Sequence, residues 1–388
     1  MPNYRYLTAD KVHNGFQFVE DTIIKVDESG HIVELLSSAV CENENVERFE
    51  GVLCPGFVNA HCHLELSHLF GQIPEATGLV GFVKQIPASR NQFSEADKSN
   101  ASQKAMQEMY DNGIVAVGDI ANTAETLALK QTFPMHTVTF VEAMGFVPQG
   151  ASARFAYSKG ILERFQLAEN LQGYTLNAYV VPHAPYSVCT DLFQLINAED
   201  EDSIVSMHSQ ESAAELQYFK DKTGAICDLY EFLGINDSYF EPNGVSSVSY
   251  ALSGFQGNQS MILVHNTFTD EATLTYLNSL QRKIFFCLCP NANWFIERTL
   301  PNIPLLMESG IPICLGTDSL ASNYQLDIIK EMERIQQHYA TISIEEMLVW
   351  ATSNGAKALG LGEKIGSFEV GKCPGINLLK SEKIIKLV

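Results

Sequence analysis

Eight short apolar segments, separated by longer stretches of helical character, constrain the fold of this chain more than any other feature. The segments are residues 56–63, 113–120, 135–145, 176–183, 204–208, 261–265, 283–290 and 311–318. Their interiors are nearly all apolar, as expected of parallel strands that are buried on both faces. Strands that alternate with helices form βα units around a parallel sheet. The pattern therefore predicts an α/β fold, a (β/α)8 TIM-like barrel.

The segments between these strands carry helix signals. Residues 100–112 have apolar positions at helical spacing, and Gly113 follows them. Thr190 and Asp191 begin an apolar stretch in the manner of a helix cap. Residues 344–361 form a final helix that glycines stop, and residues 224–260 exceed what one crossover needs, so we expect this insertion at the top of the barrel.

The two ends of the chain have a different pattern. The chain has 388 residues, whereas a barrel typically needs about 250. Residues 1–54 resemble short strands with turns, among them a hairpin of 22–26 with 31–35. Turn and strand character returns after the last helix. We predict a small β domain made of residues 1–54 plus 362–388, beside a barrel domain of residues 55–361.

The charge and the cysteines limit the classes of partner. The formal net charge is -21, which disfavours nucleic acid and anionic membranes and favours a small-molecule substrate. We expect no membrane span and no secretion signal. Nine cysteines, an odd number without a C-x-x-C pair, indicate a reducing and hence cytoplasmic compartment. A homodimer is the assembly to test.

Histidines and one aspartate gather at the ends of the predicted strands. They are His61, His63, His183, His208, His265 and Asp318. In (β/α)8 enzymes the carboxyl ends of the strands are where catalytic groups collect. Six such groups on five strands are hard to explain by core packing alone.

The pair His61 and His63 gives the sharpest indication of a metal. Side chains two residues apart on a strand share a face, so both imidazoles can reach one cation. His208 and Asp318 would complete the ligand set. Nitrogen and oxygen donors of this kind suit zinc first, and also iron or manganese. The alternative, a pair of hydrogen-bonded core histidines, does not explain the other ligands.

Glu211 follows His208 by three residues, where the fifth strand turns into its helix. A carboxylate at this position can move protons between a metal-activated water and a leaving group. The alternative is a first-turn glutamate that interacts favourably with the helix dipole. We favour catalysis for Glu211 and the structural role for Glu215.

Six motifs together identify a family resemblance. They are PGFVNAHCHLE (55–65), VPHAPYS (181–187), HSQE (208–211), VHN (264–266), CPNAN (289–293) and LGTDS (315–319). This ordered set resembles the amidohydrolase superfamily, in the branch of aromatic-amine deaminases and chlorohydrolases. Within that branch it is most similar to deaminases of adenosine-type nucleosides and of aminodeoxyfutalosine.

The resemblance implies a role for each matching residue. His61, His63, His208 and Asp318 would bind one divalent metal ion, because the fourth strand offers no lysine to bridge a second ion. Asp318 would also accept a proton from the attacking water, His265 would orient that water, and Glu211 would protonate a ring nitrogen before ammonia leaves. The expected substrate-binding residues are His183, Glu65, Ser319, Asn293 and Trp294.

Other functions are weighed against this one. Hydrolysis of another C–N bond or of a C–Cl bond would use the same metal set, because the pocket selects the leaving group. A catalytically inactive barrel used as a scaffold ranks low, since such a chain would lose ligands. The cytidine-deaminase fold is excluded because the chain has no P-C-x-x-C motif.

Overall fold

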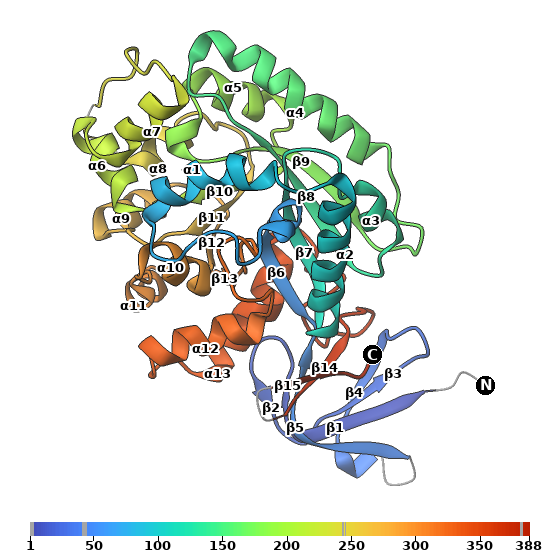
Figure 1. Cartoon of the computed structure of the whole chain (residues 1–388). Helices are drawn as coiled ribbons and strands as arrows, with labels where there is room; N and C mark the ends of the chain where they lie inside the picture. Colours follow the sequence, from blue (N-terminus) through green and yellow to red (C-terminus); the bar gives the residue numbers. More distant parts are fainter. Residues whose placement is uncertain (1–3, 41–44, 243, 245, 381–382) are drawn as a thin grey trace.

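The computed structural model describes residues 4–40, 45–242, 244, 246–380 and 383–388. A barrel of strands surrounded by helices forms the larger part, and a β sheet built from both ends of the chain lies beside it (Figure 1). No helix in these described ranges is long and apolar enough to cross a membrane.

All eight predicted barrel strands are present and run parallel to their neighbours. They are β6 (Phe57–Cys62), β7 (Ile114–Ala121), β8 (His136–Ala143), β9 (Leu176–Pro182), β10 (Ile204–Ser209), β11 (Ser260–His265), β12 (Ile284–Leu288) and β13 (Ile313–Leu315). The last strand is shorter than predicted. The chain leaves the extended conformation after it, and Asp318 has a φ of 56°.

Backbone hydrogen bonds join the two four-stranded halves, β6-β7-β8-β9 and β10-β11-β12-β13, into one barrel. On one side the amide of His208 donates to the carbonyl of His183 at 2.9 Å. On the other side the amides of Thr317 and Asp318 donate to the carbonyl of His61 at 3.0 and 3.1 Å. The predicted TIM-like barrel is confirmed.

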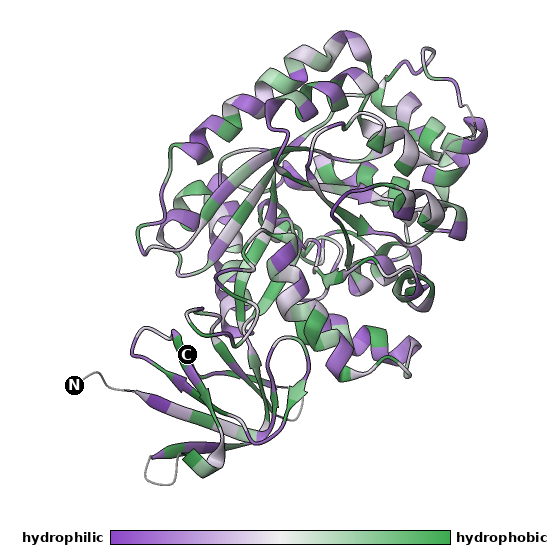
Figure 2. Cartoon of the chain, turned by 180° about the vertical axis from the view of Figure 1, so that it is seen from behind, coloured by the Kyte–Doolittle hydropathy of each residue, from purple (hydrophilic) through white to green (hydrophobic). Residues whose placement is uncertain are grey.

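Helices cover the outside of the barrel. They are α1 (Gly78–Arg90), α2 (Glu95–Asp111), α3 (Leu127–Thr132), α4 (Ala151–Gln166), α5 (Thr190–Glu199), α6 (Ala213–Asp221), α7 (Ala225–Leu233), α8 (Ser247–Leu252), α9 (Glu271–Ser279), α10 (Pro290–Glu297), α11 (Ile303–Glu308), α12 (Ile328–His338), α13 (Ile344–Val349) and α14 (Gly355–Ala358). Many of them carry alternating hydrophilic and hydrophobic stretches, whereas the barrel strands are mostly hydrophobic (Figure 2).

Two helices differ from the sequence prediction in instructive ways. Helix α2 begins at Glu95 rather than at residue 100, because Ser94 forms a capping box with Asp97. The predicted final helix is interrupted by a π-helical turn, Trp350–Asn354, between α13 and α14. Helix α5 begins at Thr190, as predicted.

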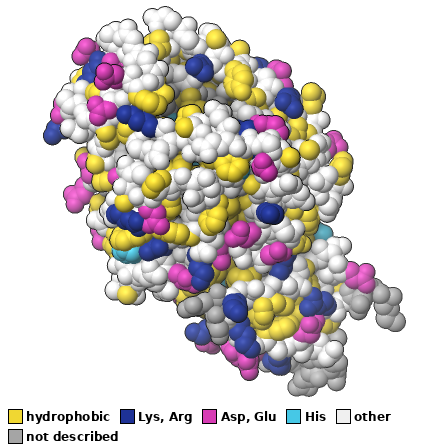
Figure 3. Space-filling model, in the orientation of Figure 1, with side chains coloured by type: hydrophobic (Ala, Val, Ile, Leu, Met, Phe, Trp, Pro, Cys, Tyr) yellow, Lys and Arg dark blue, Asp and Glu magenta, His cyan; other side chains and the backbone are white. Residues whose placement is uncertain are grey.

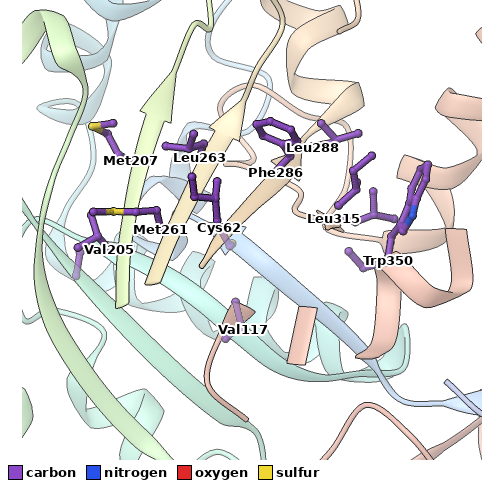
Figure 4. Close-up of a cluster of buried hydrophobic side chains, with 14 of the residues drawn as sticks. Cys62, Val117, Val205, Met207, Met261, Leu263, Phe286, Leu288, Leu315 and Trp350 are labelled. Atoms are coloured by element: carbon purple, nitrogen blue, oxygen red, sulfur yellow. The ribbon is translucent and has the colours of Figure 1, made fainter. Parts of the chain in front are cut away.

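Side chains on the barrel strands alternate between two hydrophobic clusters. The inner cluster fills the barrel and includes Val138 and Phe140 of β8. The outer cluster lies between strands and helices, where Met207, Leu263 and Trp350 belong to it (Figure 4). Gly118 faces the crowded interior, since a Cβ there would lie 2.5 Å from the carbonyl oxygen of Ala60.

The terminal sheet has the order β15-β14-β5-β1-β3-β4, with β2 paired to β1. Its strands are β1 (Arg5–His13), β2 (Phe18–Val19), β3 (Ile23–Val26), β4 (Ile32–Leu36), β5 (Val46–Pro55), β14 (Ile376–Lys380) and β15 (Lys383–Lys386). The predicted hairpin is β3 with β4, and β14 pairs antiparallel with β5, which joins the two ends of the chain. The exact domain boundaries stay a prediction, and β5 extends one residue beyond residue 54.

Charged side chains of both signs lie on the surface, and the described cysteines are unpaired. Lys and Arg side chains are interspersed with Asp and Glu over the face that Figure 3 shows. Every cysteine in the described ranges is a free thiol.

A buried ion pair supports the turn that follows β6. Lys130 Nζ lies 2.5 Å from Asp119 Oδ2, and both side chains are fully buried. Asp119 Oδ1 accepts a hydrogen bond from the amide of Leu64 at 2.8 Å, directly after His63. Lys130 also donates to Thr139 Oγ1 at 2.9 Å. The pair therefore holds the end of the strand that carries two candidate ligands.

We predict that Lys130→Met lowers the free energy of unfolding by about 3–5 kcal/mol, because it leaves the buried Asp119 carboxylate without its cationic partner. Urea denaturation would measure the loss. The control, Lys104→Met on the exposed face of α2, should change stability by less than about 0.5 kcal/mol. Equal midpoints for the two variants would contradict the assignment.

Candidate metal and substrate site

Four side chains predicted as ligands meet at the carboxyl ends of the strands. His63 Nε2 lies 3.1 Å from His61 Nε2 and 3.3 Å from Asp318 Oδ1. His61 Nε2 lies 3.7 Å from the same Asp318 oxygen. His61 also forms a compact set with His208 and His265, in which one ligand atom from each residue lies within 4.8 Å of the others.

The alternation of side chains between the inner and outer faces of β6 is broken near its end, and this break turns both histidines toward the centre. Val58 and Ala60 belong to the inner cluster, whereas Cys62 belongs to the outer one. The register with β7 shifts between Asn59 and Cys62, so an irregularity lies between these positions. Such bulges redirect side chains, which explains how His61 and His63 enter the barrel mouth although the interior below them is apolar.

Strained backbone gathers at the same place. Gln210, His265, Asn266 and Asp318 have positive φ values of 48°, 75°, 55° and 56°. A non-glycine residue in this region costs of order 1–3 kcal/mol and persists where its surroundings fix it. The ends of β10, β11 and β13 are therefore held in one arrangement.

The protonation of these groups fits a divalent cation. Burial lowers the pKa of His61 to about 3, so its imidazole is neutral. Burial opposes ionisation of Asp318, but the hydrogen bond with His61 and the neighbouring His63 hold its pKa well below its ordinary value. Neutral imidazoles with a carboxylate are the donor forms that metal ions require. The buried His61 Nδ1 and His208 Nε2 have no hydrogen-bond partner in the described chain.

His208 shows that the chain favours positive charge here. Burial alone lowers its pKa, but the Glu142 carboxylate, whose Oε1 lies 3.5 Å from His208 Nε2, and the charge of Glu211 raise it to about 9. A proton at this point is the counter-charge that these carboxylates attract. A divalent cation would supply the same charge more fully.

Glu211 lies beside the cluster, buried and facing the cavity. Its Oε1 lies 3.6 Å from His265 Nε2, and its Oε2 lies 3.8 Å from His208 Nδ1. Burial raises its pKa to about 8. Glu215 has the structural role expected of it, because its carboxylate accepts the amides of Gln210 and Glu211 at 3.1 and 3.2 Å.

A cavity of about 320 Å³ opens beside these groups. Its polar side includes His63, His208, Glu211 and Asp318, and its apolar wall comes from α1. The α1 residues in that wall are Leu79, Phe82, Val83 and Ile86. Such a mixture of apolar walls and a few polar groups is typical of a small-molecule site.

Of the five predicted substrate-binding residues, three line the cavity and two do not. His183, Glu65 and Ser319 line the cavity. Both oxygens of Glu65, however, accept hydrogen bonds from residues 122 and 123.

Asn293 and Trp294 are not among the residues that line the cavity. Asn293 Nδ2 lies 3.3 Å from His265 Nδ1, so it contacts a neighbour of the site. Trp294 packs on His338, with 4.7 Å between ring centroids, because α10 turns it outward. The prediction that Trp294 lines the pocket is therefore not supported by its position.

The sequence analysis missed Glu142 and Asn122. Both line the cavity, and Asn122 Nδ2 donates to Glu142 Oε2 at 2.9 Å. Burial opposes ionisation of Glu142, but His183 and His208 hold its pKa well below the ordinary value. The signal was available, since Glu142 continues the inner-face alternation of Val138 and Phe140.

Gly316 allows the close approach of β13 to β6. A Cβ at this position would lie 2.9 Å from Cys287 Sγ, from His61 Cβ and from the His61 carbonyl oxygen. We predict that Gly316→Ala weakens the affinity for a divalent metal about tenfold or more, because displaced ligand supports typically have this effect. Titration against a chelator would measure it. The control, Gly160→Ala in α4, meets no atom within 4 Å. Unchanged affinity in Gly316→Ala would contradict the prediction.

Known proteins resemble the chain along most of its length. An adenosine deaminase from Helicobacter pylori is 26% identical over 328 residues, which cover 83% of this chain and 77% of that protein. An aminodeoxyfutalosine deaminase from Nitratiruptor sp. is 26% identical over 373 residues, covering 93% and 87%. The crystal structure of Helicobacter pylori aminofutalosine deaminase in complex with methylthio-coformycin superposes with a TM-score of 0.82 at 24% identity, covering 97% and 92%. Residues 52–388 match the model of the Amidohydrolase family. The chain therefore belongs to the amidohydrolase family.

Proposed function

We propose that this chain is a metal-dependent hydrolytic deaminase of an aminated purine nucleoside or a related N-heterocycle. One observation carries the proposal. A buried carboxyl group, Glu211, lies beside the histidine and aspartate cluster and faces a cavity of small-molecule size. The relatives named deaminases support the same chemistry.

The proposed ligands of the ion are His61, His63, His208 and Asp318. Their nitrogen and oxygen donors suit Zn²⁺ best, with Fe²⁺ and Mn²⁺ as alternatives. When bound, such an ion lowers the pKa of water and supplies a nucleophile near neutral pH.

Glu211 and His265 differ in their ability to move a proton. With its pKa raised to about 8 by burial, Glu211 is protonated at neutral pH and can donate to a ring nitrogen of the substrate. The resulting carboxylate can then accept a proton and return it to the departing ammonia. Burial holds the pKa of His265 well below its ordinary value, so its neutral ring orients the attacking water.

His183 is held in one orientation at the cavity wall. Its Nδ1 lies 2.7 Å from Ser187 Oγ, which is a hydrogen bond. Burial lowers the pKa of His183 to about 4, so the ring is neutral. A neutral ring with one nitrogen engaged can contact the substrate through the other, as we infer here.

Two other functions compete with deamination. Hydrolysis of another C–N bond or of a C–Cl bond would use the same centre, and only the pocket would differ. An inactive scaffold is disfavoured because His61 forms one compact set with His63 and Asp318 and another with His208 and His265. The net charge of -21 further supports a small-molecule substrate over nucleic acid or membrane, and the free thiols support the cytoplasm. Light scattering would test whether the protein is a homodimer.

Metal analysis followed by ammonia release tests the proposal directly. The panel is adenosine, methylthioadenosine, adenosylhomocysteine, aminodeoxyfutalosine, guanine and cytosine. We expect about one divalent ion per chain, ammonia from at least one purine nucleoside, and loss of this activity after chelation. No ammonia from any member of the panel by the metal-loaded protein would refute deamination.

We predict that Glu211→Gln keeps the metal but lowers kcat by about 10²–10⁴-fold, because an amide cannot transfer the proton. Metal content and steady-state kinetics are measured on the same preparation. Glu28→Gln makes the same chemical change in an exposed turn of the terminal sheet and should retain activity. Full turnover in Glu211→Gln would remove this residue from the mechanism.

A further inference from the structure

Glu142 and Asn122 form a polar corner of the cavity that no step of the proposed chemistry uses. Glu142 lies at the end of β8, and Asn122 follows the end of the neighbouring strand β7. Both line the cavity, and one hydrogen bond of 2.9 Å joins them. Glu142 is 6% exposed, so its carboxylate meets solvent only through the cavity.

The corner offers acceptors. The hydrogen bond between the two residues uses Asn122 Nδ2 and Glu142 Oε2. In the described part of the chain no hydrogen bond reaches Glu142 Oε1 or Asn122 Oδ1, and the closest nitrogen to Oε1, His208 Nε2, is 3.5 Å away. Both residues line the cavity, so a ligand with hydroxyl or N–H donors can reach these two acceptors.

The order of groups around the barrel suggests which part of a substrate reaches the corner. Glu211 follows β10, His183 follows β9, Glu142 ends β8 and Asn122 follows β7. These strands are consecutive neighbours, about 4.8 Å apart. The corner formed by Glu142 and Asn122 therefore lies to one side of Glu211 along the carboxyl ends of the strands.

We propose that Glu142 and Asn122 bind the vicinal hydroxyls of a pentose and so select a nucleoside over a free base. In a purine nucleoside the aminated carbon and the pentose lie at opposite ends of the ring system. A base placed with its aminated carbon at the metal cluster and its ring nitrogen at Glu211 extends past His183 toward this corner. The two hydroxyls would then donate to the two acceptors. This inference rests on the proposed function.

Two other roles for Glu142 must be separated from this one. Its carboxylate lies 3.5 Å from His208 Nε2, so one alternative is that it only orients a proposed metal ligand. Glu142, His183 and His208 also form a set that could hold a second cation. Both alternatives predict an effect on metal content, whereas pentose recognition predicts an effect that depends on the substrate hydroxyls.

The test compares adenosine with 2′-deoxyadenosine, 3′-deoxyadenosine and 2′,3′-dideoxyadenosine on the metal-loaded wild type, Glu142→Gln and Asn122→Ala. We expect each missing hydroxyl to lower kcat/KM of the wild type about tenfold, mainly through KM. In both variants the ratio of adenosine to dideoxyadenosine should fall by about tenfold or more. Glu28→Gln, the matched acid-to-amide control in an exposed turn, should keep the wild-type ratio.

Equilibrium binding of the products, inosine and 2′,3′-dideoxyinosine, provides a readout that needs no turnover. We expect the preference for inosine to be lost in Glu142→Gln and Asn122→Ala while the metal content stays at the wild-type value. Equal kinetics of the wild type on adenosine and dideoxyadenosine would overturn the pentose assignment and leave deamination intact. Loss of metal from Glu142→Gln with an unchanged substrate ratio would overturn it as well. If no aminated substrate releases ammonia, the proposed function fails, and the inosine comparison still decides the corner.

Discussion

The hydrogen bonds that close the barrel are the constraint on which the rest of the structure depends. The carbonyl of His61 accepts the amides of Thr317 and Asp318, and the carbonyl of His183 accepts the amide of His208. Residues of the candidate site therefore make both closures. Because the same backbone positions complete the sheet and present the ligands, closure brings imidazoles from the first and fifth strands together with the aspartate that follows the eighth.

Burial of charge explains why these side chains need an ion. Two carboxylates with low pKa values, Glu142 and Asp318, lie buried around His208 and its neighbours. Buried charges are costly unless they are paired, and a single proton on His208 compensates them only in part. A divalent cation would offset this cost more fully. The chain thus stores electrostatic strain that metal binding relieves, at a point where the backbone is also strained.

The sequence predicted the strands well, because apolar runs buried on both faces are distinctive. It also predicted that the candidate ligands gather at one end of the barrel, since polar residues that terminate such runs are visible in the sequence. It failed where position depends on three-dimensional packing. Trp294 follows a motif of the site, yet α10 turns it toward His338. Glu142 was overlooked because it lies inside a segment interpreted as a strand, and its inner-face phase has meaning only once the barrel is closed.

Different parts of the barrel supply the proposed metal ligands and the wall of the cavity. The proposed ligands come from β6, β10 and the turn after β13, whereas the cavity wall is built by α1 and by the ends of β7, β8 and β9. Substitutions in the second group can change what fits without moving an atom that binds the ion. The helix α1 lies in the segment between β6 and β7. The proposed substrate contacts therefore follow from tertiary structure, whereas the proposed ligands could be predicted from the strands.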